Sequence, residues 1–290
     1  MEETREITAL FHLIDDPDEE VFTSVSERII SFGKGIIPNL ENLWENTPID
    51  VIQERIELLI HRLHYRDLTI DFNSWKAQPE PDLLNGAILV ARYQYPELIT
   101  TGLYAEIEKM RRNIWLELNS YLTPLEQINV ITTILYNYYN LKGNEIKYDE
   151  PNDFLINKVL DGKRGNAISN GIIYLALAEL LDVPIRAINI PGQFILAYFD
   201  VEYDWQSPSN PAHKIQFYID PTTGNIFTHK DVESYFKKLS VPATPAYFQQ
   251  MDNKRIIRLL LAEFSKCFSE DATEYKKQEL MILADSMGAS

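Results

Sequence analysis

The segment from Arg164 to Asp220 constrains the fold of this 290-residue chain more than any other. A nearly continuous apolar stretch begins after Gly165 and Asn166, runs to Leu181, and has the length of a buried helix. Three segments rich in β-branched and aromatic residues follow, and each predicts a strand: residues 185–190, 194–201 and 215–219. One helix followed by successive strands predicts an α+β core.

Helical periodicity dominates the chain before this core. In residues 4–66, apolar residues recur at helical spacing on both sides of the acidic turn at 15–20. Asp16 is expected to cap the second helix, Gly33 to end it, and Pro38 to lie at the start of a third. The acidic turn and the Gly-Pro start resemble a HEAT repeat, so a HEAT-like helical region is expected.

Further helices are predicted between this region and the core, at residues 83–95, 103–121 and 124–139. Thr123 is the expected N-cap of the last one, and the cluster of Tyr136, Tyr138 and Tyr139 at its end is expected to pack in the core. The fold class is therefore mostly helical α+β. The expected domains are a HEAT-like region at 1–78, a core with its preceding helices at 79–245, and a helical tail at 246–290.

Composition narrows the classes of function. The formal net charge of -16 argues against a nucleic-acid partner bound through a basic surface. No apolar run reaches the ~20 residues that span a bilayer, and no signal peptide is recognised, so no membrane partner is expected. Cys267 is the single cysteine, which predicts a reducing, cytoplasmic setting. His61 and His64 lack a third ligand, so neither a metal nor another cofactor is predicted.

A series of short motifs covers residues 148–221. The matching residues are Tyr148, Asn152, Phe154, Leu155, Val159, Leu160, Arg164, Gly165, Ile168, Ser169, Tyr174, Leu175, Pro184, Pro191, Gly192, Phe194, Ile219, Asp220 and Pro221. In this order and spacing they resemble the transglutaminase-like superfamily, in particular its bacterial SirB-type branch. The resemblance implies a papain-like α+β core.

The resemblance also implies where a catalytic triad would lie. Catalytic members of the superfamily carry Cys near the helix start, His on the next strand and Asp on the strand after that. Those places hold Ala167, Gln193 and Asp220 here. Alanine is no nucleophile and glutamine is no base, so the chain is expected to be a catalytically inactive pseudoenzyme.

Some polar residues around these positions are candidates for binding. The candidates are Asn152, Arg164, Asn166, Ser169, Gln193 and Asp220. Asp220 could still accept a hydrogen bond from the Gln193 amide and form a small polar pocket for a peptide or amide group. The polar insert at 202–214 is expected to be a surface loop with Trp205 as a contact.

The leading interpretation is a protein- or peptide-binding scaffold whose partner is a protein or peptide. A second interpretation is a cysteine-independent hydrolase or acyl transferase that uses Ser169 with His229. However, Ser169 lies two residues after Ala167, about 200° around the helix, which favours a capping or packing serine. A third interpretation is a structural interaction protein whose core serves only as a stable spacer.

Overall fold

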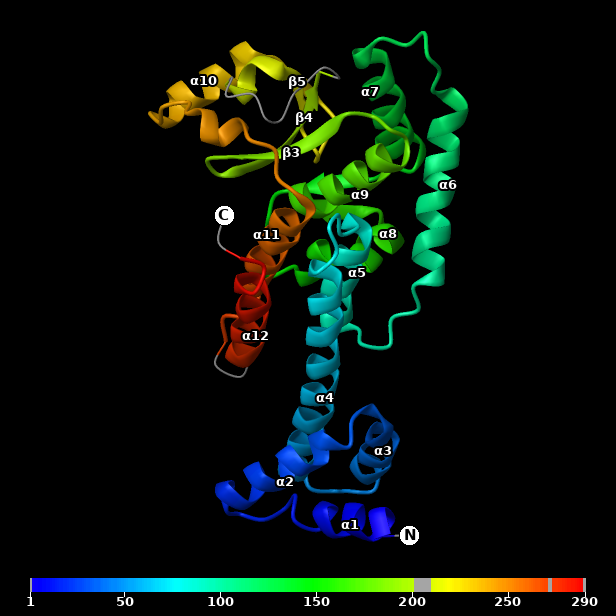
Figure 1. Ribbon diagram of the computed structural model, residues 1–290, viewed down its shortest axis with the longest axis vertical. Coiled ribbons are helices and arrows are strands. Elements are labelled where there is room, and N and C mark those ends of the chain that lie inside the picture. The colour runs from blue at the N-terminus through cyan, green and yellow to red at the C-terminus, as the bar shows by residue number, and fades with distance from the viewer. Residues whose placement is uncertain (1, 201–209, 271–272, 289–290) are drawn as a thin grey trace. The chain divides into compact units, whose positions relative to one another are not determined.

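The structure is a computed structural model, and it describes residues 2–200, 210–270 and 273–288 (Figure 1). Two compact units divide the chain, residues 1–73 and residues 74–290. The predicted boundary after residue 78 lies close to this division. The second unit holds both the predicted core and the predicted tail.

The first unit is helical throughout its described residues. Its elements are α1 (Glu2–Phe11), α2 (Glu19–Ser31), the short 3-10 helix η1 (Lys34–Ile36), α3 (Ile37–Glu45) and the N-terminal part of α4 (Asp50–Lys76). Its core holds Ile14, Phe22, Val25, Ile29, Ile36, Ile37, Leu40, Ile56, Leu59 and Leu63. The helical character is as expected, while the HEAT-like assignment remains a prediction.

The acidic turn caps α2 differently from the prediction. Asp18, not Asp16, is the N-cap, and its side chain accepts from the Glu20 N–H. Asp16 instead accepts from the backbone N–H of Asp18 at 2.9 Å. An Asp side chain readily accepts a hydrogen bond from the backbone N–H two residues later. Asp16 makes this bond within the turn, and Asp18 makes the equivalent bond at the start of α2, so Asp18 is the residue that caps the helix. Gly33 follows the α2 C-cap Phe32, as predicted for the end of that helix, and its positive φ of 77° is one that glycine adopts without steric cost.

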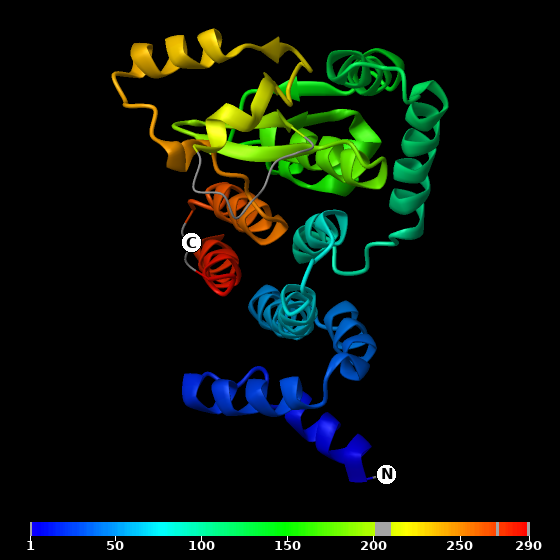
Figure 2. The same cartoon turned by 45° about the horizontal axis from the view of Figure 1, so that its top comes forward.

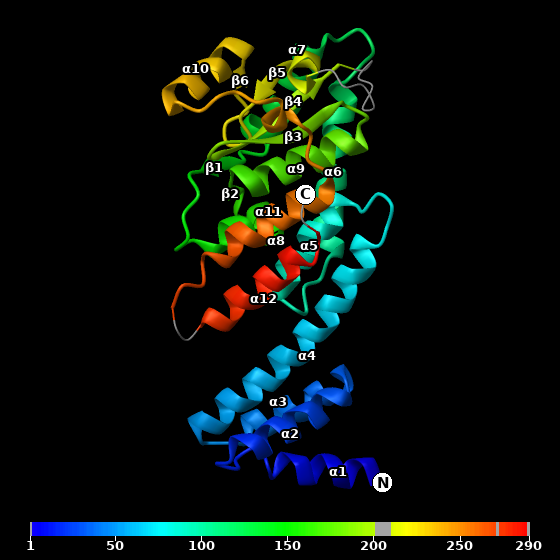
Figure 3. The same cartoon turned by 60° about the vertical axis from the view of Figure 1, so that its left-hand side comes forward.

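The second unit carries most of the helices. They are α5 (Leu83–Gln94), α6 (Thr101–Glu117), α7 (Pro124–Thr132), α8 (Ile156–Gly162), α9 (Ala167–Leu180), α10 (His229–Leu239), α11 (Asn253–Ser265) and α12 (Glu274–Asp285). A π-helix, η2 (Thr133–Tyr138), continues α7, and short 3-10 helices lie at η3 (Pro151–Phe154), η4 (Pro211–Lys214) and η5 (Pro245–Phe248). The predicted cap is confirmed, because Thr123 forms a capping box with Glu126 at the start of α7. Helices α11 and α12 pack against each other (Figure 3).

Two sheets complete this unit. The larger has the order β3-β4-β5-β6 with antiparallel neighbours, and its strands are β3 (Ile185–Ile190), β4 (Gln193–Phe199), β5 (Ile215–Ile219) and β6 (Ile226–Phe227). The smaller pairs β1 (Lys142–Asn144) with β2 (Arg164–Asn166) in parallel. The three predicted strands are confirmed, and the mostly helical α+β class with them. The sequence did not reveal β1, β2 and β6, because strands of two or three residues carry no periodicity.

Helix α9 lies at the centre of the core. Apolar side chains surround it, and residues 168–178 are all buried. It packs on one face of the larger sheet, while Val232 and Phe236 of α10 pack on the other face (Figure 2). Among the described residues, no helix has both the length and the apolar character that crossing a membrane requires.

Candidate functional site

The start of α9 is capped by its own neighbours. Ala167 is the first residue of the helix, and the Asn166 side chain accepts from the N–H groups of Ile168 at 2.9 Å and Ser169 at 3.1 Å. A nucleophile at position 167 would normally draw on such free N–H groups to stabilise its anion. Here Ala167 supplies no nucleophile, and two of these groups already have an acceptor.

Ser169 is part of the same cap and is buried, with 1% of its surface exposed. Its hydroxyl donates to the Asp153 carbonyl at 2.6 Å and accepts from the Asn166 N–H at 3.0 Å. His229 lies elsewhere: one ring nitrogen is 2.7 Å from the Ile215 carbonyl oxygen. Within the described part of the chain, no hydrogen bond joins Ser169 to His229. The geometry therefore favours the capping interpretation of Ser169 over a nucleophile.

Asp220 is held within its own turn. One carboxylate oxygen accepts from the N–H of Thr222 at 2.7 Å and from its hydroxyl at 2.6 Å, and the other accepts from the Thr223 hydroxyl at 2.8 Å. The hydrogen bond with Gln193 suggested by the sequence is absent from the described residues, which corrects that expectation. The threonines lie two and three residues after Asp220, in the same turn, so their donors are close to its carboxylate.

The first turns of α9 pack against residues that neighbour two of the expected triad positions. Gly171 lies one turn after Ala167, and a Cβ atom there would lie 2.5 Å from the Phe194 ring and 3.4 Å from Pro221. Phe194 follows Gln193 and Pro221 follows Asp220. The first turns of α9 thus pack directly against the chain beside both positions, and only glycine fits at the crossing.

The Gln193 side chain, however, belongs to the other face of the sheet. Gln193 pairs with Ile190 across the β3–β4 hairpin, and cross-strand partners share a face. Ile190 packs in the cluster that contains Val232 and Phe236 of α10. Gln193 is exposed on that face, whereas Phe194 is the β4 residue that meets α9.

The other predicted binding residues support the helix start. Arg164 forms ion pairs with Glu150 and with Asp153, the second at 3.1 Å, and Asp153 is almost fully buried. Asn152 accepts a hydrogen bond from the Tyr95 hydroxyl at 3.3 Å. These polar side chains are engaged by protein groups. Trp205 lies outside the described residues.

The Asp220 turn is packed against the rest of the core. The Tyr136 hydroxyl donates to the Pro221 carbonyl at 2.6 Å, and burial, with Tyr174 and Asp220 nearby, raises the pKa of Tyr136. On the other side, a Cβ atom at Gly143 would lie 2.3 Å from the Thr222 Cα. With neighbours this close, the turn has little room to rearrange around a substrate.

Cys267 does not supply the missing thiolate. It lies after α11, outside the triad positions, and burial, with Asp149 and Glu263 nearby, raises its pKa to about 12. A thiol with a raised pKa is a poor nucleophile near neutral pH. In the part of the chain that the structure describes, no group of three or more His, Cys, Asp or Glu is arranged to hold a metal ion.

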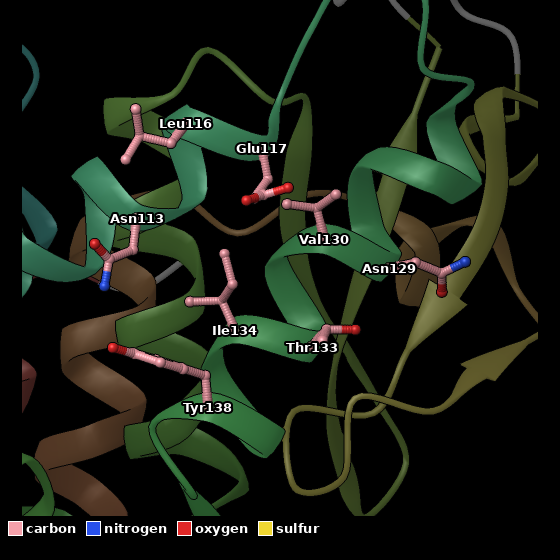
Figure 4. Close-up of a pocket in the computed structure, with 8 residues that line it drawn as sticks. All are labelled: Asn113, Leu116, Glu117, Asn129, Val130, Thr133, Ile134 and Tyr138. Atoms are coloured by element: carbon pink, nitrogen blue, oxygen red, sulfur yellow. The ribbon is translucent and has the colours of Figure 1, made fainter.

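A groove of about 560 Å³ lies elsewhere in this unit, between α6 and the α7–η2 helix (Figure 4). It is lined by Asn113, Leu116, Glu117, Asn129, Val130, Thr133, Ile134 and Tyr138. Figure 4 shows Glu117 pointing from α6 toward Val130 on the facing helix. This volume falls in the range typical of ligand sites.

The sequence did not reveal this groove. Tyr138 was expected in the core with Tyr136 and Tyr139, but 71% of its surface is exposed. The chain leaves α-helical geometry at Thr133, and the π-helical turn that follows carries Tyr138 on the rim of the groove. π-helical turns are rare and often occur at functional sites. Hydrophobic periodicity does not distinguish them from an α-helix.

Comparison with known proteins is consistent with this architecture. The chain is 23% identical to Protein SirB1 of Salmonella typhimurium over 192 residues, which are 65% of this chain and 67% of SirB1. It is 28% identical to a UPF0162 protein of Xylella fastidiosa over 118 residues, 39% of this chain and 41% of that protein. It is 22% identical to the UPF0162 protein YchA of Escherichia coli over 192 residues, 65% of this chain and 67% of YchA. No solved structure matches.

The family match lies within the second unit. The family described as the transglutaminase-like superfamily matches residues 102–262, more than half of the chain. This match spans α6 to α11, including the helix start at Ala167, the strand start at Gln193 and the turn at Asp220. The chain belongs to the transglutaminase-like superfamily.

Proposed function

We propose that this protein is a catalytically inactive member of its superfamily that binds a segment of a partner protein. One observation carries the proposal. The positions expected for the nucleophile and the base hold Ala167 and Gln193, and the Asp220 carboxylate accepts hydrogen bonds from the threonines of its own turn. Acyl transfer through a covalent intermediate needs a nucleophile and a base within hydrogen-bond reach, and these positions offer neither.

The groove between α6 and α7–η2 is the proposed binding surface. Leu116 and Tyr138 are largely exposed on it, with 66% and 71% of their surfaces accessible, while Ile134 is nearly buried. Exposed apolar side chains that gather around a cavity are a common sign of a protein contact. An apolar side chain of the partner would bury Leu116, Ile134 and Tyr138.

Charge defines the partner further. Among the described residues, the Glu117 carboxylate has neither a hydrogen-bond nor an ion-pair partner, and no basic residue lines the groove. The chain as a whole carries a net charge of -16, which attracts basic partners at long range. The proposed occupant is therefore a peptide segment in which a Lys or Arg lies close to apolar residues.

The hydrolase alternative has less support. It requires a free Ser169 hydroxyl, whereas that hydroxyl donates to Asp153 and is shielded from solvent. It also requires a base, and His229 interacts with Ile215 and Tyr218 instead. No observation on the described chain favours this alternative over the binding function.

The test uses two pools of immobilised peptides. Both pools carry the same apolar residues, and they differ at one fixed position, which is Lys in the first pool and Glu in the second. The full chain should select binders from the Lys pool. Leu116→Ser and Tyr138→Ala should each weaken binding about fivefold or more, since each removes an apolar contact of about 1–3 kcal/mol. Tyr121→Ala is the matched control, because Tyr121 is 94% exposed and does not line the groove.

The mass of each recovered peptide separates the two parts of the proposal. Peptides that return with unchanged mass support inactivity, whereas cleaved or amine-modified peptides would show that the protein is an enzyme. Selection from the Glu pool, or binders that the groove variants retain at full strength, would refute the groove as the binding surface.

A further inference from the structure

A second cavity lies where α11 passes the edge of the larger sheet. It has a volume of about 320 Å³ and is lined by Asn189, Ala246, Gln249, Met251, Arg255, Arg258, Leu259 and Ala262. Between η5 and α11, the Met251 N–H donates to the Ala187 carbonyl of β3 at 2.8 Å. The cavity shares no lining residue with the groove of Figure 4.

The charge of this cavity is opposite to that of the chain. Two arginines line it and no acidic residue does, although acidic residues exceed basic ones by 16 overall. Arg255 and Arg258 are three residues apart on α11, so they share one face of the helix. A site that concentrates positive charge in an acidic protein favours an anion as its ligand.

Most N–H donors of the two arginines have no partner among the described residues. In the part of the chain that the structure describes, the half-buried Arg255 guanidinium has no hydrogen-bond or ion-pair partner. Arg258 donates to the Gly288 carbonyl at 3.1 Å. It also forms an ion pair with Asp285 in which the nitrogen–oxygen distance is long, 3.9 Å. Five N–H donors on each guanidinium leave most of this donor capacity available.

The sheet edge adds a backbone donor. The Ala187 carbonyl points away from β4 and accepts from Met251. In an antiparallel strand the backbone N–H and C=O groups of every second residue point to the same side, here the edge of the sheet that β4 does not cover. Asn189 is two residues further along β3 and lines the cavity. Its backbone N–H therefore points toward the space that the arginines flank.

We propose that this cavity binds a small ligand through a carboxylate or phosphate group, held by Arg255 and Arg258. The planar guanidinium matches both oxyanions in a two-point contact, and charged hydrogen bonds of this kind are the strong ones. Gln249 and the Asn189 N–H supply neutral donors beside them. Leu259, Met251 and Ala262 supply an apolar wall for the rest of the ligand.

The test uses the full chain and two probes, inorganic phosphate and succinate, titrated separately at constant ionic strength. Calorimetry measures affinity, and amide NMR locates the response. At least one probe should bind saturably at millimolar concentration and shift residues 246–262. The probe that binds more tightly distinguishes a phosphorylated ligand from a carboxylate.

Three variants decide whether the cavity is responsible. Arg255→Gln should weaken binding by about tenfold or more, the value expected for losing a charged hydrogen bond. Ala246→Glu places a carboxylate in the cavity and should abolish binding. Arg112→Gln is the matched control and should leave affinity unchanged, because Arg112 is an exposed arginine on α6 for which the described residues offer no ion pair and which lines none of these cavities.

Several results would overturn the proposal. Absence of saturation with both probes would do so, as would full affinity in Arg255→Gln with an unchanged thermal unfolding curve. An equal loss in Arg112→Gln would assign the signal to general electrostatic attraction rather than to this cavity.

Discussion

Replacing Ser169 by alanine tests whether this serine is a structural cap or a hidden nucleophile. The hydroxyl makes two buried bonds, to the Asp153 carbonyl and from the Asn166 N–H. Truncation leaves a buried acceptor and a buried donor without their partner. Each such group costs about 1–3 kcal/mol. The free energy of unfolding of the second unit should therefore fall by about 2–4 kcal/mol, because part of each cost is relieved by water.

Urea unfolding followed by circular dichroism measures this loss, and hydrogen exchange on α9 peptides assigns it to the second unit. The midpoint should shift by about 1 M. Ser265→Ala is the matched control, because Ser265 is equally buried but its hydroxyl makes one bond, to Ala262 in its own helix. The control should lose less than about 1 kcal/mol.

Two results would refute the reasoning about Ser169. Unchanged stability in Ser169→Ala would show that the cap does not contribute to folding. Labelling of Ser169 by a serine-directed fluorophosphonate in the native protein would show that its hydroxyl is accessible and activated. Either result would reopen the cysteine-independent hydrolase interpretation.

Two further predictions concern thiols. Because the pKa of Cys267 is raised to about 12, its thiolate is scarce below that pH, and iodoacetamide at pH 8 should alkylate it at least about a hundredfold more slowly than a free cysteine; a rate like that of a free thiol would contradict the burial. In a Cys267→Ser background, Ala167→Cys should have a pKa lowered only slightly by the helix end, since Asn166 already accepts from two N–H groups. Adding Gln193→His should change this little, because position 193 faces α10; a strongly lowered pKa in the double variant would show that the two side chains meet.

Much of the fold was predictable because its signals are local. The apolar stretch after Asn166 predicted α9, and β-branched segments predicted β3, β4 and β5. Thr123 was predicted as an N-cap from its place before Pro124, and in the structure it forms a capping box with Glu126. The elements that escaped prediction were short or irregular, such as the paired strands β1 and β2 and the π-helical turn at Thr133. Their geometry depends on neighbours distant in the sequence.

For the candidate site, too, the sequence predicted where the residues lie along the chain but not which groups they bond. Sequence spacing placed Ala167, Gln193 and Asp220 on a helix start, a strand start and a turn, and the structure has them there. It did not predict that Asp220 would be bonded by Thr222 and Thr223. A side-chain hydrogen bond goes to the donor that is nearest in space, and spacing alone does not rank donors.

The sequence by itself predicted the helix α9 and the strands β3, β4 and β5 in their order, and it fixed Ala167 and Gln193 as the residues at the expected nucleophile and base positions. Both follow from residue identity and local periodicity. Only the tertiary structure decided that Ser169 is buried in a cap, that Gln193 faces α10, and that Arg255 and Arg258 line an acid-free cavity. Burial and hydrogen-bond partners depend on packing between segments that are distant in the sequence. The periodicity of a sequence predicts which face of a helix or strand a residue occupies, but not which residues pack against that face.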